Sequence, residues 1–201
     1  MSARFLLRLL PVVLAGCSAK LTSNLAASTP AVTYVGVQAG VLVPGAALDA
    51  AVDGLQLDLQ QATGGLKAVP LELSRDGRVL KLRLGADASF GPDSAELEPG
   101  ALEVYAALAQ VLARRPGTVA HILVHGEVAS AELATDLTTR RAASVRAYLA
   151  ARGVPETRLR AEGRGSSQRL TPDAAATNRR VELVLKPIVA GQEAEAWVPP
   201  S

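Results

Sequence analysis

The chain has 201 residues, of which 49% are hydrophobic and 3% aromatic, with one cysteine, two histidines and a formal net charge of +2. This length suits one domain with appendages, and the cysteine and histidine counts exclude an internal disulfide and a cysteine-rich zinc finger. The small net charge and the scarcity of aromatic residues argue against a nucleic-acid-binding protein, because phosphate contacts need a local excess of Lys and Arg.

Residues 1–16 have the pattern of an export signal. Arg4 and Arg8 make the start basic, and the apolar run over residues 9–15 is too short to span a bilayer, which needs about 20 apolar residues. Residues 14–17, Leu-Ala-Gly-Cys, resemble the lipobox of bacterial lipoproteins. The resemblance implies a signal peptide removed before Cys17 and acyl chains such as palmitate on that cysteine. The alternative is ordinary secretory cleavage, with Cys17 as an incidental thiol.

Removal of the signal also changes the charge. Arg4 and Arg8 are its only charged residues, so the count of Lys and Arg falls from 21 to 19 and equals the 19 acidic residues. The mature chain is therefore formally neutral.

Residues 17–45 are rich in Ser, Thr, Ala, Gly and Pro, and we interpret them as the lipidated N-terminus and a tether. Residues 46–68 are predicted to form an accessory helix and a linker, because Leu48, Val52, Leu55 and Leu59 recur at helical spacing before Gly64-Gly65. If the roughly 50 residues after Cys17 were flexible, their root-mean-square span would be about 40 Å.

Residues 69–187 are predicted to form one α/β domain. Period-two alternation on both sides of Asp76-Gly77 predicts a hairpin. Helices are predicted over residues 97–112 and 131–152, a buried strand over 118–124, and short strands near Leu159 and over 180–185. This order favours a sandwich of helices on a mixed sheet. Residues 188–201 are interpreted as a flexible tail.

One charged residue falls within the apolar face of the second predicted helix. With Leu137 set at the origin and 100° per residue, Arg141 lies at roughly 40°, between Leu137 and Val145 at roughly 80°. A guanidinium in this position either extends past its neighbours or meets a carboxylate, from the protein or from a ligand at the rim of a cleft.

Four blocks of sequence, in order along the chain, carry a family resemblance. They are residues 90–99, residues 137–145 with Tyr148-Leu149 and Gly153-Val154, Glu162-Gly163 with Gly165, and residues 178–183. Over residues 79–186 they resemble the OmpA-like domain, the peptidoglycan-binding module shared by OmpA, the peptidoglycan-associated lipoprotein and the stator protein MotB. The resemblance implies an OmpA-like two-layer sandwich, with two main helices on a mixed sheet, preceded by the hairpin strand and the accessory helix.

The resemblance also implies a ligand, the diaminopimelate of cell-wall stem peptides, bound without a covalent bond. Its zwitterionic end needs a cation and an anion. The carboxylate-binding arginine of the family falls on Arg141, and a planar guanidinium suits bidentate pairing with a carboxylate. Asn178 and Arg180 in the closing block are further ligand candidates, although Arg180 could equally form a salt bridge at the sheet edge.

The anionic partner depends on the alignment. The family has Gly-His-Thr-Asp at the end of the second strand, where this chain has Val-His-Gly-Glu at residues 124–127. Aligning His125 puts Glu127 at the family's Asp, whereas counting back from Arg141 without a gap puts Gly126 there. Asp136 and Glu132 are other possible sources of charge. A carboxylate of Glu127 across a cleft from Arg141 would favour ligand binding, and one that closes onto Arg141 or turns away would favour a docking role.

These observations predict a noncatalytic outer-membrane lipoprotein, anchored through Cys17 on the periplasmic side, that binds peptidoglycan and tethers the envelope to the cell wall. Envelope proteins are a further class of partner, and nucleic acid is not expected as one. Neither catalytic residues nor a cofactor or metal are expected, because His125 has no cysteine nucleophile or metal-ligand set with it. The alternative is a structural or docking subunit of an envelope complex with a degenerate peptidoglycan site.

Overall fold

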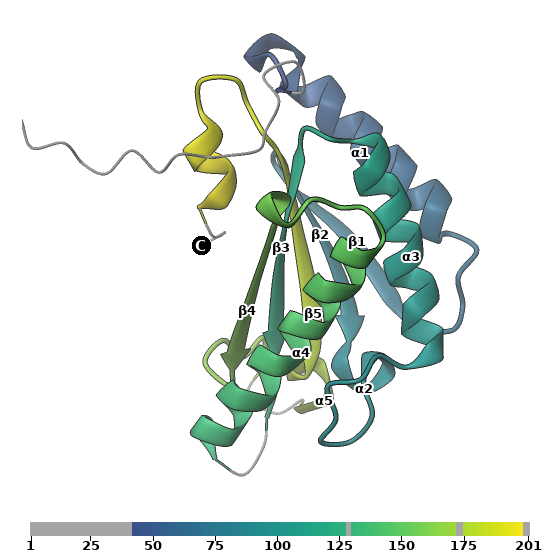
Figure 1. The fold of residues 1–201 in the computed structure, drawn as a ribbon, viewed down its shortest axis with the longest axis vertical. Coiled ribbons are helices and arrows are strands. Elements are labelled where there is room, and N and C mark those ends of the chain that lie inside the picture. The colour runs from purple at the N-terminus through teal and green to yellow at the C-terminus, as the bar shows by residue number, and fades with distance from the viewer. Residues whose placement is uncertain (1–41, 128–129, 172–174, 199–201) are drawn as a thin grey trace, which may run out of the picture. The chain divides into compact units, whose positions relative to one another are not determined.

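The computed structural model describes residues 42–127, 130–171 and 175–198 (Figure 1). The predicted signal peptide, Cys17 and most of the predicted tether lie outside the described residues. Within the described part, no helix has the length and apolar character needed to cross a membrane.

Five strands form one mixed sheet in the order β1-β2-β5-β3-β4. Their bounds are β1 (Leu71–Asp76), β2 (Val79–Gly85), β3 (Thr118–His125), β4 (Leu159–Gly165) and β5 (Arg180–Pro187). β3 and β4 run parallel, and the other neighbouring strands are antiparallel. The predicted hairpin is β1-β2, and its turn places Gly77 at a φ of 56°, which glycine adopts without steric cost. The predicted mixed sheet is confirmed.

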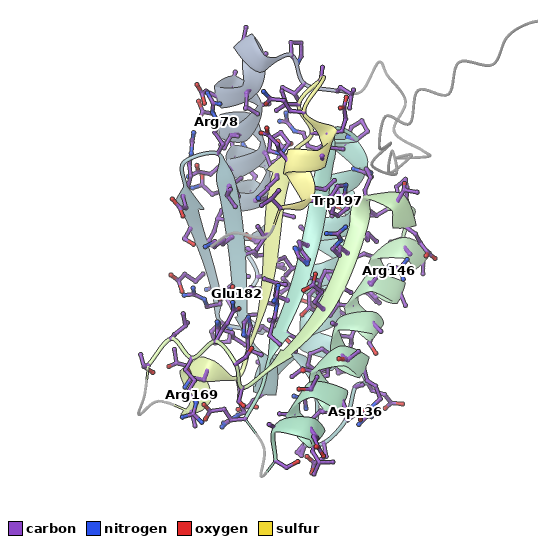
Figure 2. All side chains as sticks on the ribbon, turned by 90° about the vertical axis from the view of Figure 1, so that its left-hand side faces the viewer. Arg78, Asp136, Arg146, Arg169, Glu182 and Trp197 are labelled. Carbon is purple, nitrogen blue, oxygen red and sulfur yellow. The ribbon has the colours of Figure 1, made fainter. Side chains whose placement is uncertain are left out.

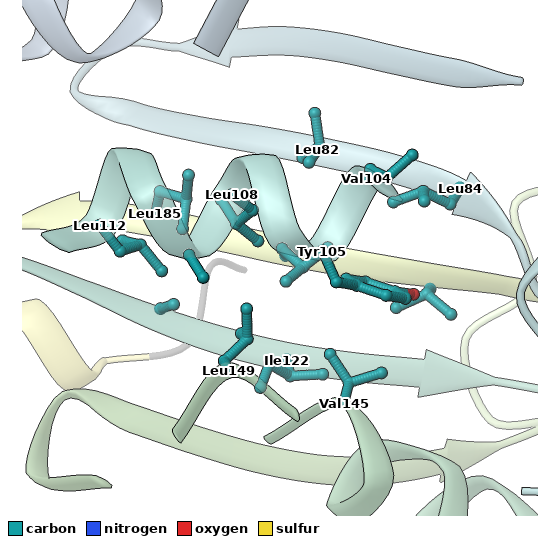
Figure 3. Packing of buried hydrophobic residues seen from close by; sticks show 14 of the residues in the cluster. Leu82, Leu84, Val104, Tyr105, Leu108, Leu112, Ile122, Val145, Leu149 and Leu185 are labelled. Atoms are coloured by element: carbon teal, nitrogen blue, oxygen red, sulfur yellow. The ribbon is translucent and has the colours of Figure 1, made fainter. Parts of the chain in front are cut away.

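Three long helices, α1 (Leu48–Thr63), α3 (Pro99–Arg114) and α4 (Ala131–Ala151), pack on one face of the sheet (Figure 1). Two short helices, α2 (Ala86–Ser89) and α5 (Ala175–Asn178), precede α3 and β5. Alternate residues of the central strands point into this layer. The core includes Leu82, Leu84, Ile122 and Leu185 from the strands, with Tyr105, Leu108, Leu112, Val145 and Leu149 from the helices (Figure 3).

α1 is part of this core rather than an accessory element. The predicted apolar stripe of α1 is buried in the same cluster as the sheet and α3. Arg115 at the end of α3 donates from Nε to Asp58 Oδ2 of α1 at 2.8 Å. Gly54 makes room for this contact, because a Cβ there would lie 2.8 Å from Arg115 Nη2. The stripe predicted the helix correctly, but the boundary placed before residue 69 does not separate two packing units.

Residues 188–198 also differ from the expectation of a flexible tail. Val43 donates its N–H to the Ile188 carbonyl at 2.9 Å and accepts from the Ala190 N–H at 3.1 Å. Ile188 and Ala196, the latter in the 3₁₀ helix η4 (Glu193–Trp197), are buried with Val119 at the start of β3. The apolar side chains of these residues cover the end of the sheet. The segment that enters the domain at Val43 and the segment that leaves it after β5 are therefore joined at the same end of the sheet.

Candidate functional site

A pocket of about 230 Å³ lies where β3 ends and α4 begins. Its walls come from four segments: the turn after β2, the residues after β3, the first half of α4 and the start of β5. The lining residues are Asp87, Pro92, Asp93, Gly126, Glu127, Ala134, Leu137, Thr138, Arg141 and Arg179. Arg141 and Glu127, the two principal candidates from the sequence, thus line one pocket.

Arg141 is held by backbone carbonyls rather than by a protein carboxylate. Its side chain is 5% exposed. Nε donates to the Ser94 carbonyl at 2.8 Å, Nη2 donates to the Gly91 carbonyl at 3.0 Å, and the guanidinium lies 5.0 Å from the centroid of the Phe90 ring. Burial lowers the pKa of Arg141, and the nearby carboxylates of Asp87 and Asp93 raise it. The guanidinium is fixed in orientation, and Nη1 has no hydrogen-bond partner among the described residues.

The loop that supplies these carbonyls also presents Asp93 to the pocket. Asp93 has a φ of 49° and is the one non-glycine residue with a positive φ in the described ranges. Aspartate tolerates this conformation better than most residues. The side chain of Asp93 is exposed, and no ion pair is found for it within the described part of the chain. The hydrogen bonds from Arg141 therefore hold the loop over residues 91–94 in place, and this loop presents the carboxylate of Asp93 to the same pocket.

Glu127 does not close onto Arg141. Its Oε1 forms an ion pair with Arg169 Nε at 2.8 Å and accepts a hydrogen bond from Asn178 Nδ2 at 3.1 Å. Asn178 is 2% exposed, and its Oδ1 accepts from the Leu170 N–H at 2.8 Å. Asn178 thus lies behind the pocket wall, where it fixes Glu127 to the segment that follows β4.

Arg180, the remaining candidate, does not line this pocket. Its Nε donates to Glu182 Oε1 at 2.6 Å, and its other two nitrogens donate to the carbonyls of Asn178 and Gln168. Glu182 lies on the sheet, and Figure 2 shows it with Arg169 below it in the loop beyond β4. Arg180 therefore forms a salt bridge on the sheet, with Glu182, as the alternative to ligand binding expected. Glu132 and Asp136 do not line the pocket either.

The structure adds Asp87 and Arg179 to the site. Arg179 donates from Nε and Nη2 to both carboxylate oxygens of Asp87, at 2.6 to 3.0 Å. The closing block of sequence indicated Arg180, but its neighbour Arg179 is the arginine that lines the pocket. Asp87 had no signal in the sequence, because its position depends on the turn of α2.

Glycines bring α4 directly onto the backbone of β4 under the pocket. A Cβ on Gly163 would lie 2.3 Å from the Thr139 nitrogen. The Gly165 N–H donates to Thr138 Oγ1 at 3.1 Å, and the Gly126 N–H donates to the Gly165 carbonyl at 2.9 Å. The backbones of α4 and β4 are therefore tightly packed next to Gly126 and Thr138, which line the pocket.

His125 stands apart from the pocket. It is 2% exposed, and neither ring nitrogen has a hydrogen-bond partner among the described residues. Burial, with the charge of Arg180, lowers the pKa of His125 to about 4. The ring is therefore neutral near pH 7. In the described ranges, no three His, Cys, Asp or Glu side chains come together as a metal site.

Comparisons with known proteins found a matching family model and several similar solved structures. The OmpA family model matches residues 89–182. A MotB-like protein from Desulfovibrio vulgaris is 27% identical, with a TM-score of 0.61, over 71% of this chain and 95% of that one. The periplasmic domain of Helicobacter pylori MotB is 16% identical, with a TM-score of 0.55, over 68% and 94%.

The cell wall anchor of the T6SS from Pseudomonas aeruginosa is 20% identical, with a TM-score of 0.53, over 64% of this chain and 94% of that one. At these identities, the last two similarities establish a shared fold alone. No curated protein matches the chain in sequence.

Proposed function

We propose that this protein, whose residues 89–182 match the OmpA family model, binds peptidoglycan through the diaminopimelate of stem peptides and links the outer membrane to the cell wall. One observation carries the proposal. A single pocket of about 230 Å³ combines the fixed guanidinium of Arg141 with the carboxylates of Asp93 and Glu127.

The charges of this pocket suit a zwitterionic ligand end. An amino-acid end carries its carboxylate and its ammonium on one carbon, so the protein must supply a cation and an anion close together. Arg141 offers Nη1 to the carboxylate as a charge-assisted hydrogen bond. Asp93, whose charge acts on Arg141, offers a free carboxylate to the ammonium. Glu127 supports it, with Oε1 already engaged by Arg169 and Asn178.

The proposed role is binding without catalysis. The histidine nearest the pocket in sequence, His125, is buried and is not among the lining residues. A lipid on Cys17 would hold the chain at the outer membrane, with the domain on the periplasmic side, and multiple acyl chains give stable anchoring without a transmembrane helix. Envelope proteins are proposed as a further class of partner.

The placement of the two ends supports a tether. Val43, where the chain enters the domain, lies beside Ile188 at the end of the sheet where β3 begins. The pocket lies where β3 ends. β3 has eight residues and therefore separates the two ends by about 25 Å. Membrane attachment and wall attachment would act at opposite ends of one strand.

Sedimentation with purified diaminopimelate-type sacculi tests the proposal. We expect residues 18–201 to sediment with sacculi and the Arg141→Ala variant to bind at least tenfold more weakly, since a charge-assisted hydrogen bond is lost. Asp93→Asn should also weaken binding while keeping the fold, because asparagine tolerates a positive φ. Arg140→Ala is the matched control: this exposed neighbour pairs with Asp136 and does not line the pocket.

Failure of the wild-type chain to sediment, or equal binding by Arg141→Ala, would contradict the proposal.

The second candidate, a docking subunit with a degenerate site, is favoured by the engagement of Glu127 with Arg169 and Asn178. It predicts that sacculi are not bound and that an envelope protein is bound instead. The sedimentation assay with sacculi therefore distinguishes the two proposed functions.

A further inference from the structure

Arg179 is the second guanidinium of the pocket, and its surroundings differ from those of Arg141 and Arg180. Its side chain is 30% exposed, whereas that of Arg180 is 5% exposed. Asp87 holds Nε and Nη2, which leaves Nη1 without a hydrogen-bond partner among the described residues. The carboxylate of Asp87 raises the pKa of Arg179, so the group stays charged.

Backbone hydrogen bonds fix this ion pair in place. The Ala86 N–H donates to the Arg179 carbonyl at 2.9 Å and joins the end of β2 to the start of β5. Asp87 follows Ala86 directly, and the Arg179 N–H donates to the Ala175 carbonyl at 3.0 Å. Because both partners are attached to the sheet end, the guanidinium of Arg179 is oriented before any ligand arrives.

Arg179 also belongs to the wall of a second pocket, of about 260 Å³. This pocket has an apolar part that includes Pro70, Leu71 and Leu84. Both pockets share Arg179, so its side chain lies at the boundary between them. A group on the ligand that reaches this boundary meets a fixed, charged donor.

We propose that Arg179, oriented by Asp87, binds a second carboxylate of the ligand, separate from the carboxylate that Arg141 takes. This inference rests on the proposed function. In a stem peptide the diaminopimelyl residue is joined to the side-chain carboxyl of a glutamyl residue, whose α-carboxylate lies within one residue of it. Arg179 would then discriminate between stem peptides with this carboxylate free and those in which it is an amide.

The ion pair between Arg179 and Asp87 determines how strong the preference for a free carboxylate should be. Asp87 neutralises part of the charge of Arg179, which weakens the attraction for a second anion. However, the same contact immobilises the side chain, so little rotamer entropy is lost on binding. We expect a preference of about tenfold for the free carboxylate, the difference that one moderate hydrogen bond to a charged group supplies.

Calorimetry with two synthetic tripeptides tests this inference on the mature, lipid-free chain. The first is L-alanyl-γ-D-glutamyl-meso-diaminopimelate, and the second has the glutamyl α-carboxylate as an amide. Wild type should bind the first about tenfold more tightly. Arg179→Gln should bind both with the affinity that wild type has for the amide, which also shows that the pocket is folded. Asp87→Asn, which frees the guanidinium, should reduce the preference.

Arg146→Gln is the matched control, because it removes an arginine paired with Glu156, away from both pockets, and should keep the preference. Equal binding of the two peptides by wild type, or an unchanged preference in Arg179→Gln, would overturn the inference and leave the proposed function intact. Failure of wild type to bind either peptide would overturn the proposed function and this inference with it.

Discussion

At the scale of single residues, two buried basic side chains have opposite environments. Arg141 donates to two carbonyls and faces a pocket. His125 has no hydrogen-bond partner in the described part of the chain and lies near Arg180, Arg164, Arg83 and Glu182. The first arrangement keeps a charge available for a ligand, and the second favours a neutral ring.

The environment of His125 predicts a pH-dependent stability. Its pKa is about 4 in the folded protein and near 6.5 in an unfolded chain. Between these values the unfolded state binds a proton that the folded state does not, so the free energy of unfolding falls as pH drops from 6.5 toward 4. The expected loss is on the order of 2 to 3 kcal/mol. Urea unfolding at a series of pH values measures it.

His125→Leu should remove most of this slope and cost little at pH 7.5, because the ring nitrogens have no partners to lose. Burial lowers the pKa of His121 as well, so that histidine accounts for part of the remaining slope. As a control, His121→Leu should destabilise at pH 7.5, because it loses a contact of 2.8 Å with Glu162. An unchanged slope in His125→Leu would show that other groups cause the pH dependence.

Single residues also show what the sequence can predict about the site. The position of Arg141 follows from helical phase relative to Leu137 and Val145, a property of the sequence alone. The partners of Glu127 depend on the path of the segment after β4, for which no periodic pattern exists. In the same way, the sequence does not show which of Arg179 and Arg180 lines the pocket, because this depends on how the chain enters β5.

At the scale of elements, the contact between α4 and β4 determines the site. Gly163 allows the helix to lie against the strand, and four pocket residues are on that helix: Ala134, Leu137, Thr138 and Arg141. Gly163→Ala would place a Cβ within 2.3 Å of the Thr139 nitrogen and 2.7 Å of the Thr138 carbonyl carbon. Both are backbone atoms and cannot rotate away, so α4 must shift.

We expect Gly163→Ala to lower the free energy of unfolding by about 2 to 4 kcal/mol, at the upper end of overpacking effects. Gly65→Ala is the control, because its Cβ would meet nothing within 4 Å and its φ is not in the left-handed region. Chemical unfolding of both variants measures the difference. Equal midpoints would contradict the close packing of α4 against β4.

Elements also mark a limit of sequence-based prediction. The apolar stripe of α1 correctly predicted a helix with one buried face. A stripe does not reveal what covers it, and the contact with α3 depends on Gly54 and the pair of Asp58 with Arg115, which are distant in sequence. Alternation on both sides of Asp76-Gly77 predicted the strands β1 and β2, but the order of the strands in the sheet is a tertiary property.

At the scale of the whole molecule, the segments before and after the domain are joined at one end of the sheet. Residues 188–198 hold Val43 through two backbone hydrogen bonds and bury Ile188 against Val119. Only 24 residues lie between Cys17 and Leu42, fewer than the roughly 50 counted from the sequence pattern, so a fully extended chain spans on the order of 80 Å. The proposed lipid anchor on Cys17 would therefore have a limited reach.

Deletion of residues 188–201 tests the role of this junction. We expect the free energy of unfolding to fall by about 2 to 3 kcal/mol, since a buried isoleucine is lost, and the amide of Val43 to exchange faster with solvent. Sacculus binding should be unchanged, because the pocket is at the other end of β3. Deletion of residues 199–201 alone is the control. Unchanged exchange at Val43 in the longer deletion would contradict the assigned contact.

The joined segments have a mechanical consequence. In the proposed tether, tension between the envelope and the wall would enter the domain at Val43 and leave it at the pocket beyond His125, along the direction of β3 and β5. The hydrogen bonds between these strands lie across that direction, so they are loaded in shear and share the force, whereas peeling would break them one after another. A domain attached in this way resists pulling most strongly along the line on which its proposed role would load it.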